Sequence, residues 1–211
     1  MTTPTLIDIP FDLRHHCWFC GEPCNDVFAF YATRHTPHPP LSVPACHECH
    51  LFARKAPLSS IWDCHQTVKD ALLKRYQTHL AIGDNWTETE LAESEFSCKI
   101  LSGFRESGWK MYLIAKSRIN FRPWPLTLEG IDIDEPTSSQ QLQINGINFN
   151  SLNQAIHHYG NSLGLDQHFL TALINILGRH RFSHALKLAK LMRSATQKDK
   201  RQFLMELNED K

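Results

Sequence analysis

Two closely spaced cysteine pairs are the residues of this chain whose type and spacing carry a recognisable chemistry. Cys17 and Cys20 form one C-x2-C pair, and Cys46 and Cys49 form a second pair after 25 intervening residues. Each pair can reach one metal ion from a tight turn, and four thiolates complete the tetrahedral coordination of structural zinc. Gly21 follows the first pair and suits a turn that needs a positive φ. The spacing predicts one structural Zn2+ bound by these four cysteines.

Two other arrangements of the cysteines stay open at this point: a pair of disulfides, and two unrelated pairs of buried thiols. The chain begins without a basic segment followed by an apolar core, and no apolar run approaches the length of a membrane span. We therefore expect a reducing, cytoplasmic location without membrane attachment, which favours zinc over disulfides. The other cysteines are then spare thiols, although Cys24 lies close enough in sequence to compete as a ligand: Cys24, Cys64 and Cys98.

The formal net charge is zero, but the charge is unevenly distributed. Residues 141–211 carry 9 Lys and Arg against 5 Asp and Glu, together with five histidines. A basic segment is compatible with a phosphate-binding surface and equally with an ordinary solvated helical face.

The N-terminal half is expected to change from short extended elements to helices. A short strand is predicted near Val27–Tyr31 and a proline-rich loop over Thr36–Pro44. Apolar residues recur at helical spacing from Ile61 to Leu80, after a serine that can cap the helix. A capping box at Thr87 begins another helix, and a further helix is predicted over Ile100–Asn120.

The C-terminal part is expected to follow a polar linker, Pro136–Gln141, after a short strand over Leu126–Asp134. Asn145-Gly146 predicts a two-residue turn in a β-hairpin, and Ser151 can cap the next helix. Three more helices are expected, at about Asp166–Leu177, Phe182–Arg193 and Lys198–Leu207. The predicted fold class is therefore α+β, mainly α, with domains at residues 1–135 and 142–211.

The residues between and after the cysteine pairs resemble the H-N-H endonuclease family, whose ββα-metal core is a treble clef. Thr33-Arg34-His35-Thr36-Pro37 lies between the pairs, and His50 directly follows the second pair. The resemblance covers about residues 14–80 and implies that His35 is the general base and His50 a ligand of a catalytic Mg2+ or Mn2+. The chain departs from the family pattern at Arg34, where an acidic metal ligand is usual, and it lacks the central asparagine.

A second segment, from Gly146 to Ile156 with Tyr159-Gly160, resembles the NUMOD-type helix-turn-helix modules of homing endonucleases. That resemblance implies that Asp166–Leu177 is a recognition helix, but its composition is mostly apolar and also suits a helix buried in a bundle. The better candidates for contact with nucleic acid are the basic residues that follow: Arg179, Arg181, Lys187 and Lys190.

Two function classes follow from these patterns. In the first, a zinc-stapled, H-N-H-like protein engages nucleic acid, with DNA as the preferred partner, and divalent-metal-dependent endonuclease activity stays an open question. In the second, a non-catalytic zinc scaffold or adaptor docks onto a protein partner or a larger assembly.

Overall fold

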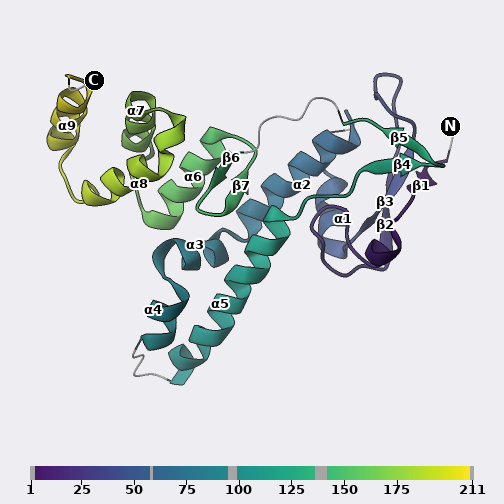
Figure 1. Cartoon of the computed structure of the whole chain (residues 1–211), viewed down its shortest axis with the longest axis horizontal. Helices are drawn as coiled ribbons and strands as arrows, with labels where there is room; N and C mark the ends of the chain where they lie inside the picture. Colours follow the sequence, from purple (N-terminus) through teal and green to yellow (C-terminus); the bar gives the residue numbers. More distant parts are fainter. Residues whose placement is uncertain (1–2, 58, 95–98, 136–141, 210–211) are drawn as a thin grey trace. The chain divides into compact units, whose positions relative to one another are not determined.

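The structure is a computed structural model, and it describes residues 3–57, 59–94, 99–135 and 142–209. The predicted linker Pro136–Gln141 and Cys98 lie outside the described residues. The chain is mainly helical with small sheets, as expected from the sequence (Figure 1). It divides into two compact units, each built from two segments of chain. Unit 1 comprises Met1–Tyr76 and Leu113–Ser139, and unit 2 comprises Gln77–Tyr112 and Gln140–Lys211.

Unit 1 contains a three-stranded sheet in the order β1-β3-β2, in which β1 is parallel and β2 antiparallel to β3. All five residues of β3 are buried, since the strand lies in the middle of the sheet. Helix α1 follows β3 directly and packs on β2, β3 and α2. The elements of the sheet and its helices are β1 (Thr5–Leu6), β2 (Asp26–Phe30), β3 (Leu41–Ala45), α1 (His47–Ala53) and α2 (Ile61–Arg75).

The strand β3 corrects one expectation, because Thr36–Pro44 was predicted to be a proline-rich loop. Pro44 lies inside β3 opposite Val27 of β2, and its carbonyl accepts a hydrogen bond from the backbone N–H of Trp18 at 2.8 Å. A proline can occupy a strand position where no ladder hydrogen bond needs its missing N–H. The fixed φ of Pro44 then holds the chain extended just before the second cysteine pair.

Unit 1 ends in a second small sheet, β4 (Leu126–Leu128) paired with β5 (Ile131–Ile133). A single strand was predicted here. The chain instead turns at Glu129 and Gly130, whose φ values are 52° and 77°. Two successive positive φ angles are typical of the two-residue turn of a β-hairpin.

Unit 2 joins two helices from the middle of the chain to a C-terminal bundle. Its elements are α3 (Gln77–Asn85), α4 (Glu88–Glu93), β6 (Leu142–Ile144), β7 (Ile147–Phe149), α6 (Leu152–Leu163), α7 (Gln167–Leu177), α8 (Phe182–Leu191) and α9 (Gln197–Glu209). Helix α5 (Lys99–Asn120) begins in unit 2 and ends in unit 1. The β6–β7 hairpin turns at Asn145-Gly146 as predicted, and Ser151 caps α6 by accepting a hydrogen bond from the Gln154 N–H.

Residues 77–112 therefore belong to the same compact unit as the C-terminal helices, whereas the predicted division grouped them with the N-terminal region. Helix α3 packs on α6, and α7 contacts α6, α8 and α9. The helix expected from Ile61 to Leu80 is interrupted at Tyr76, which separates α2 from α3.

Candidate metal centre

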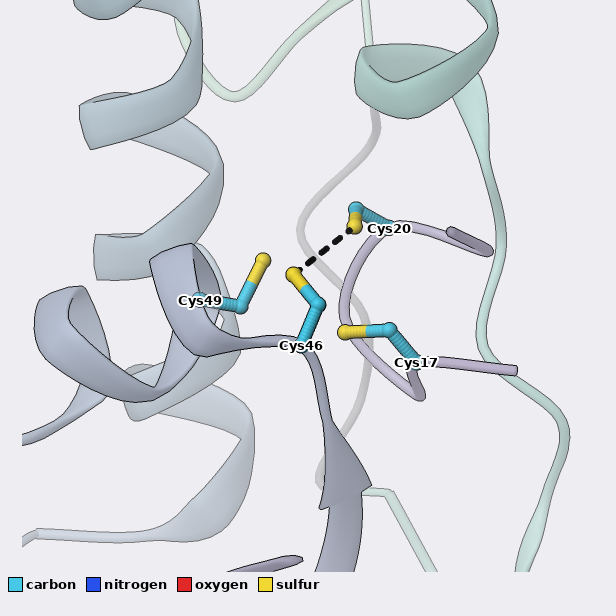
Figure 2. Close-up of side chains that lie close together, drawn as sticks. All are labelled: Cys17, Cys20, Cys46 and Cys49. Atoms are coloured by element: carbon cyan, nitrogen blue, oxygen red, sulfur yellow. Dashed lines mark hydrogen bonds between the residues drawn. The ribbon is translucent and has the colours of Figure 1, made fainter. Parts of the chain in front are cut away.

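The four predicted cysteines come together in one cluster. The Sγ atoms of Cys17, Cys20, Cys46 and Cys49 all lie within 4.8 Å of one another. Figure 2 shows the four sulfur atoms pointing toward a common centre, two from the loop before β2 and two from the start of α1. Among the residues that the structure describes, this is the only cluster of three or more potential metal ligands.

Local backbone geometry presents both pairs. In the first pair, Gly21 has φ +75° and its N–H donates to the Cys17 carbonyl at 2.8 Å, which closes the turn. In the second pair, Cys46 is the N-cap of α1 in an extended conformation, and Cys49 lies in the first turn. The partial positive charge at a helix N-terminus favours thiolate over thiol. Gly21 thus has the positive φ that the sequence predicted.

The cluster fits a zinc ion by distance and by charge. A tetrahedral zinc site with Zn–S bonds of about 2.3 Å separates its sulfurs by about 3.8 Å. The Cys20 and Cys46 sulfurs lie 3.8 Å apart. Hydrogen bonds among the thiols lower the pKa of Cys46 and raise the pKa of Cys49. Four thiolates at this spacing need a cation between them, and the site is compatible with zinc.

A buried arginine from α5 contacts two of the sulfurs. The Nη2 atom of Arg118 lies 3.5 Å from the Cys20 Sγ and 3.8 Å from the Cys46 Sγ. Its Nη1 atom lies 2.7 Å from the carboxylate of Glu48, which stands between Cys46 and Cys49 in sequence, and also contacts the Tyr76 hydroxyl. Burial by itself lowers the pKa of Arg118, but the negative charge of Cys20 and the hydrogen bonds to Cys20 and Glu48 together outweigh it, so the net shift is upward.

A buried lysine lies in the same region. The Nζ of Lys69, on α2, donates to the carbonyls of Arg118, Ile119 and Phe121 at 2.8, 3.1 and 2.8 Å. These carbonyls belong to the last turn of α5 and the residue beyond, where a cation is favourable. Burial lowers the pKa of Lys69 to about 8, against the opposing charge of the cysteine thiolates.

Neither of the buried cations Arg118 and Lys69 was predicted from the sequence, although their positions among apolar residues were a signal. Arg118 lies three residues after Ala115 and one before Ile119, both buried, and Lys69 lies between the buried Val68 and Leu72. A charged residue within an apolar helical stripe indicates a buried partner. The partners lie far away in sequence and were not readable from the pattern: the cysteine sulfurs for Arg118, and the carbonyls at the end of α5 for Lys69.

The structure does not bring His35 and His50 together. His35 is exposed in the turn beyond the Phe30–Leu41 end of the β2–β3 pair, whereas His50 contacts Asp26 at the opposite end. The two ends of β2 are four residue steps apart, which corresponds to about 13 Å along the strand. The Nδ1 atom of His50 lies 3.3 Å from the Asp26 Oδ2.

The other histidine of this loop has a structural role. His38 is buried, its Nδ1 lies 2.9 Å from the Pro39 carbonyl, and its Nε2 accepts a hydrogen bond from the Ile61 N–H at 2.9 Å. Ile61 is the first residue of α2, so the imidazole satisfies one of the free N–H groups of that helix. Burial lowers the pKa of His38, which keeps the ring neutral as an acceptor.

The basic residues predicted to contact nucleic acid are exposed on unit 2. Arg179 and Arg181 lie in a short 3-10 helix before α8, and Lys187 and Lys190 share a face of α8. Phe182 and three other α8 residues form the opposite, buried face. By contrast, the helix suggested as a recognition helix, α7, buries most of its apolar residues: Phe169, Leu170, Leu173 and Ile174.

No protein-family model matches this chain, and no curated protein or solved structure matches it. No helix within the described ranges is both long enough and apolar enough to cross a membrane. The assignment of function therefore depends on the chain's own residues and their geometry.

Proposed function

We propose that this chain is a zinc-stapled protein of treble-clef type that binds nucleic acid through its C-terminal unit. The four-cysteine cluster supports a structural role for the metal, because four thiolates fill a tetrahedral site and leave no open position for substrate. The arrangement of a cysteine turn, a strand pair and a helix that begins at the second cysteine pair supports the treble-clef assignment.

The observation that carries the nucleic-acid assignment is a basic, carboxylate-free segment. Residues 167–198 contain no Asp or Glu, and the basic side chains around α8 are exposed. No carboxylate contacts these side chains among the ion pairs of the described residues. Unneutralised cations on one helix face attract polyanions by releasing the counterions of the phosphate backbone. We propose duplex DNA as the first partner to test.

Salt-dependent binding of the full chain to a DNA duplex tests this function. We expect the double substitution Lys187→Glu and Lys190→Glu to weaken binding at least tenfold and to lower the salt slope by about 2, one for each lost phosphate contact. The matched control is Lys55→Glu with Lys74→Glu, two exposed lysines of unit 1, which should leave both quantities unchanged. Equal effects of the two pairs would contradict the proposal.

Endonuclease activity is a separate question within this proposal, and the resemblance to the H-N-H family motivates it. If the chain cleaves DNA, His35 is its expected base, and His35→Ala should abolish Mg2+- or Mn2+-dependent plasmid nicking while zinc content stays the same. The exposed His15 supplies the control, as His15→Ala should cleave like the wild type. Nicking that survives His35→Ala would place the activity elsewhere.

A protein-docking scaffold is the second candidate, favoured by the exposed apolar side chains of unit 1. Phe11 is 75% exposed and Tyr31 59% exposed. Charge substitution at these two positions should release a protein partner from the native complex and leave DNA affinity untouched. The Lys187 and Lys190 substitutions should do the reverse if nucleic acid is the partner.

A further inference from the structure

Arg118 contributes to the metal centre from a distant part of the sequence. Its side chain is 7% exposed, and its guanidinium lies within hydrogen-bonding distance of the Cys20 and Cys46 sulfurs, one from each cysteine pair. A zinc ion bound by four thiolates carries a formal charge of about −2, and a buried charge of this size needs compensation. Arg118 is the cation in direct contact with the sulfurs.

The guanidinium is held in place by the cysteine-pair segment itself. Glu48 binds its Nη1 at 2.7 Å, while Nη2 remains directed at the sulfurs. The Tyr76 hydroxyl donates to the same carboxylate at 2.9 Å, and Arg75 approaches it at 3.7 Å. The Nη1 atom of Arg118 therefore binds the carboxylate, and the Nη2 atom binds the thiolates. The single ammonium group of a lysine cannot make both contacts with separate nitrogen atoms.

We propose that Arg118 is an outer-sphere partner of the zinc centre that holds Cys20 and Cys46 by N–H···S hydrogen bonds and slows loss of the metal. This inference depends on the zinc binding of the proposed function but not on its nucleic-acid binding. Hydrogen bonds to a metal-bound thiolate reduce its affinity for protons, so the thiolate is a poorer leaving ligand. Metal binding and docking of the C-terminal end of α5 are then reciprocally coupled.

The test measures the rate at which the zinc-loaded full chain transfers its metal to an excess of a chromogenic chelator. We expect Arg118→Met to release zinc at least tenfold faster than the wild type, in the range typical of lost outer-shell partners. Arg118→Lys should be intermediate, because it keeps the charge without the fork. The control is Arg75→Met, which removes a contact to Glu48 from a side chain that is 70% exposed and should change the rate less than twofold.

A measurement on the wild type covers the case in which Arg118→Met does not fold. With 15N-labelled arginine, the zinc-loaded chain should show one guanidinium whose N–H protons exchange slowly with solvent, and Arg118→Lys should remove that signal. Release of zinc at the same rate in Arg118→Met, Arg75→Met and wild type would overturn the proposal, as would a zinc-loaded chain without a protected guanidinium. A purified chain that contains no zinc would overturn the proposed metal centre as well.

Discussion

The two units are stabilised by different kinds of interaction. Unit 1 has charged groups in its interior: Arg118 is buried against the cysteine cluster, and Lys69 is buried against the carbonyls at the end of α5. Unit 2 is held by apolar packing of its helices, and a buried contact joins the His158 Nε2 and the Asp84 carboxylate at 2.9 Å. Charged interiors are stable only while every partner is present, whereas apolar packing tolerates the loss of one contact. The units should therefore respond differently to the same treatment.

Removal of the metal should have the largest effect, and it should unfold the metal-centred part of unit 1 while the C-terminal helices of unit 2 stay folded. Zinc contributes about 10–16 kcal/mol to the folding of small zinc domains, so Cys46→Ser or chelation should unfold the metal-centred part of unit 1. Hydrogen exchange should then accelerate in residues 3–57 and 113–135 while residues 142–209 stay protected. The control is Cys24→Ser, because Cys24 is not part of the cluster. Simultaneous loss of protection in both units would show that they fold as one.

Gly21→Ala should destabilise unit 1 by about 3–4 kcal/mol, from steric overlap and from backbone strain. An added Cβ would lie 2.5 Å from the Phe121 ring, and φ is +75°. Gly130→Ala separates the two causes, because φ is +77° there and no atom lies within 4 Å of the added Cβ. Thermal unfolding should show a clearly larger loss for Gly21→Ala, and equal losses would assign the whole effect to φ.

In unit 2, Asp84→Ala should cost about 3 kcal/mol, because it leaves the His158 imidazole buried without its carboxylate. Both side chains are almost fully buried, at 4% and 1% exposed. Replacement of the pair by Leu and Phe should cost less than the single substitution, since apolar groups of similar volume need no partner. Denaturant unfolding of the wild type and the two variants gives this comparison, and zinc content should be the same in all three.

The smallest expected effect concerns acid sensitivity of unit 1. Burial lowers the pKa of His65 from 6.5 to about 3, so the unfolded chain binds a proton between these values that the folded chain does not. Stability should therefore fall by about 1.4 kcal/mol per pH unit below 6.5 from this group alone. His65→Phe should remove that slope, while thiolate protonation affects both chains alike. The same pH dependence in wild type and His65→Phe between pH 7 and 5.5 would contradict this origin.

A further comparison concerns the isolated C-terminal segment. Residues 142–211 were predicted to form a separate domain, and this stays a prediction, but the structure shows what a fragment of these residues would lack. Helix α3 packs on α6, and it supplies Asp84 to His158 and the Asn85 side chain to the Ser162 carbonyl. A fragment that begins at residue 142 leaves this surface of α6 uncovered, so we expect it to be less stable than a longer fragment that begins at residue 77.

Local sequence determined the parts of this protein whose causes are local. The two C-x2-C spacings place four sulfurs in one cluster, and the Asn145-Gly146 dipeptide makes a hairpin turn. Ser60 and Thr87 cap their helices by accepting hydrogen bonds from backbone N–H groups three residues later; Thr87 was predicted to do so, and either Ser59 or Ser60 was expected before α2. The hairpin turn, the helix caps and each single cysteine pair depend on residues within a few positions of one another, which is why a sequence pattern can identify them.

Tertiary structure decided the rest. Burial in the centre of a sheet makes Leu41–Ala45 a strand despite its proline, and packing of α3 on α6 joins α3 to unit 2. Strand pairing places His35 and His50 at opposite ends of β2 and β3, although both flank the cysteine pairs in sequence. Arg118 reaches the sulfurs from 98 residues beyond Cys20. No local pattern encodes such contacts, because they form only when distant segments share one low-dielectric interior that requires each buried charge to find a partner.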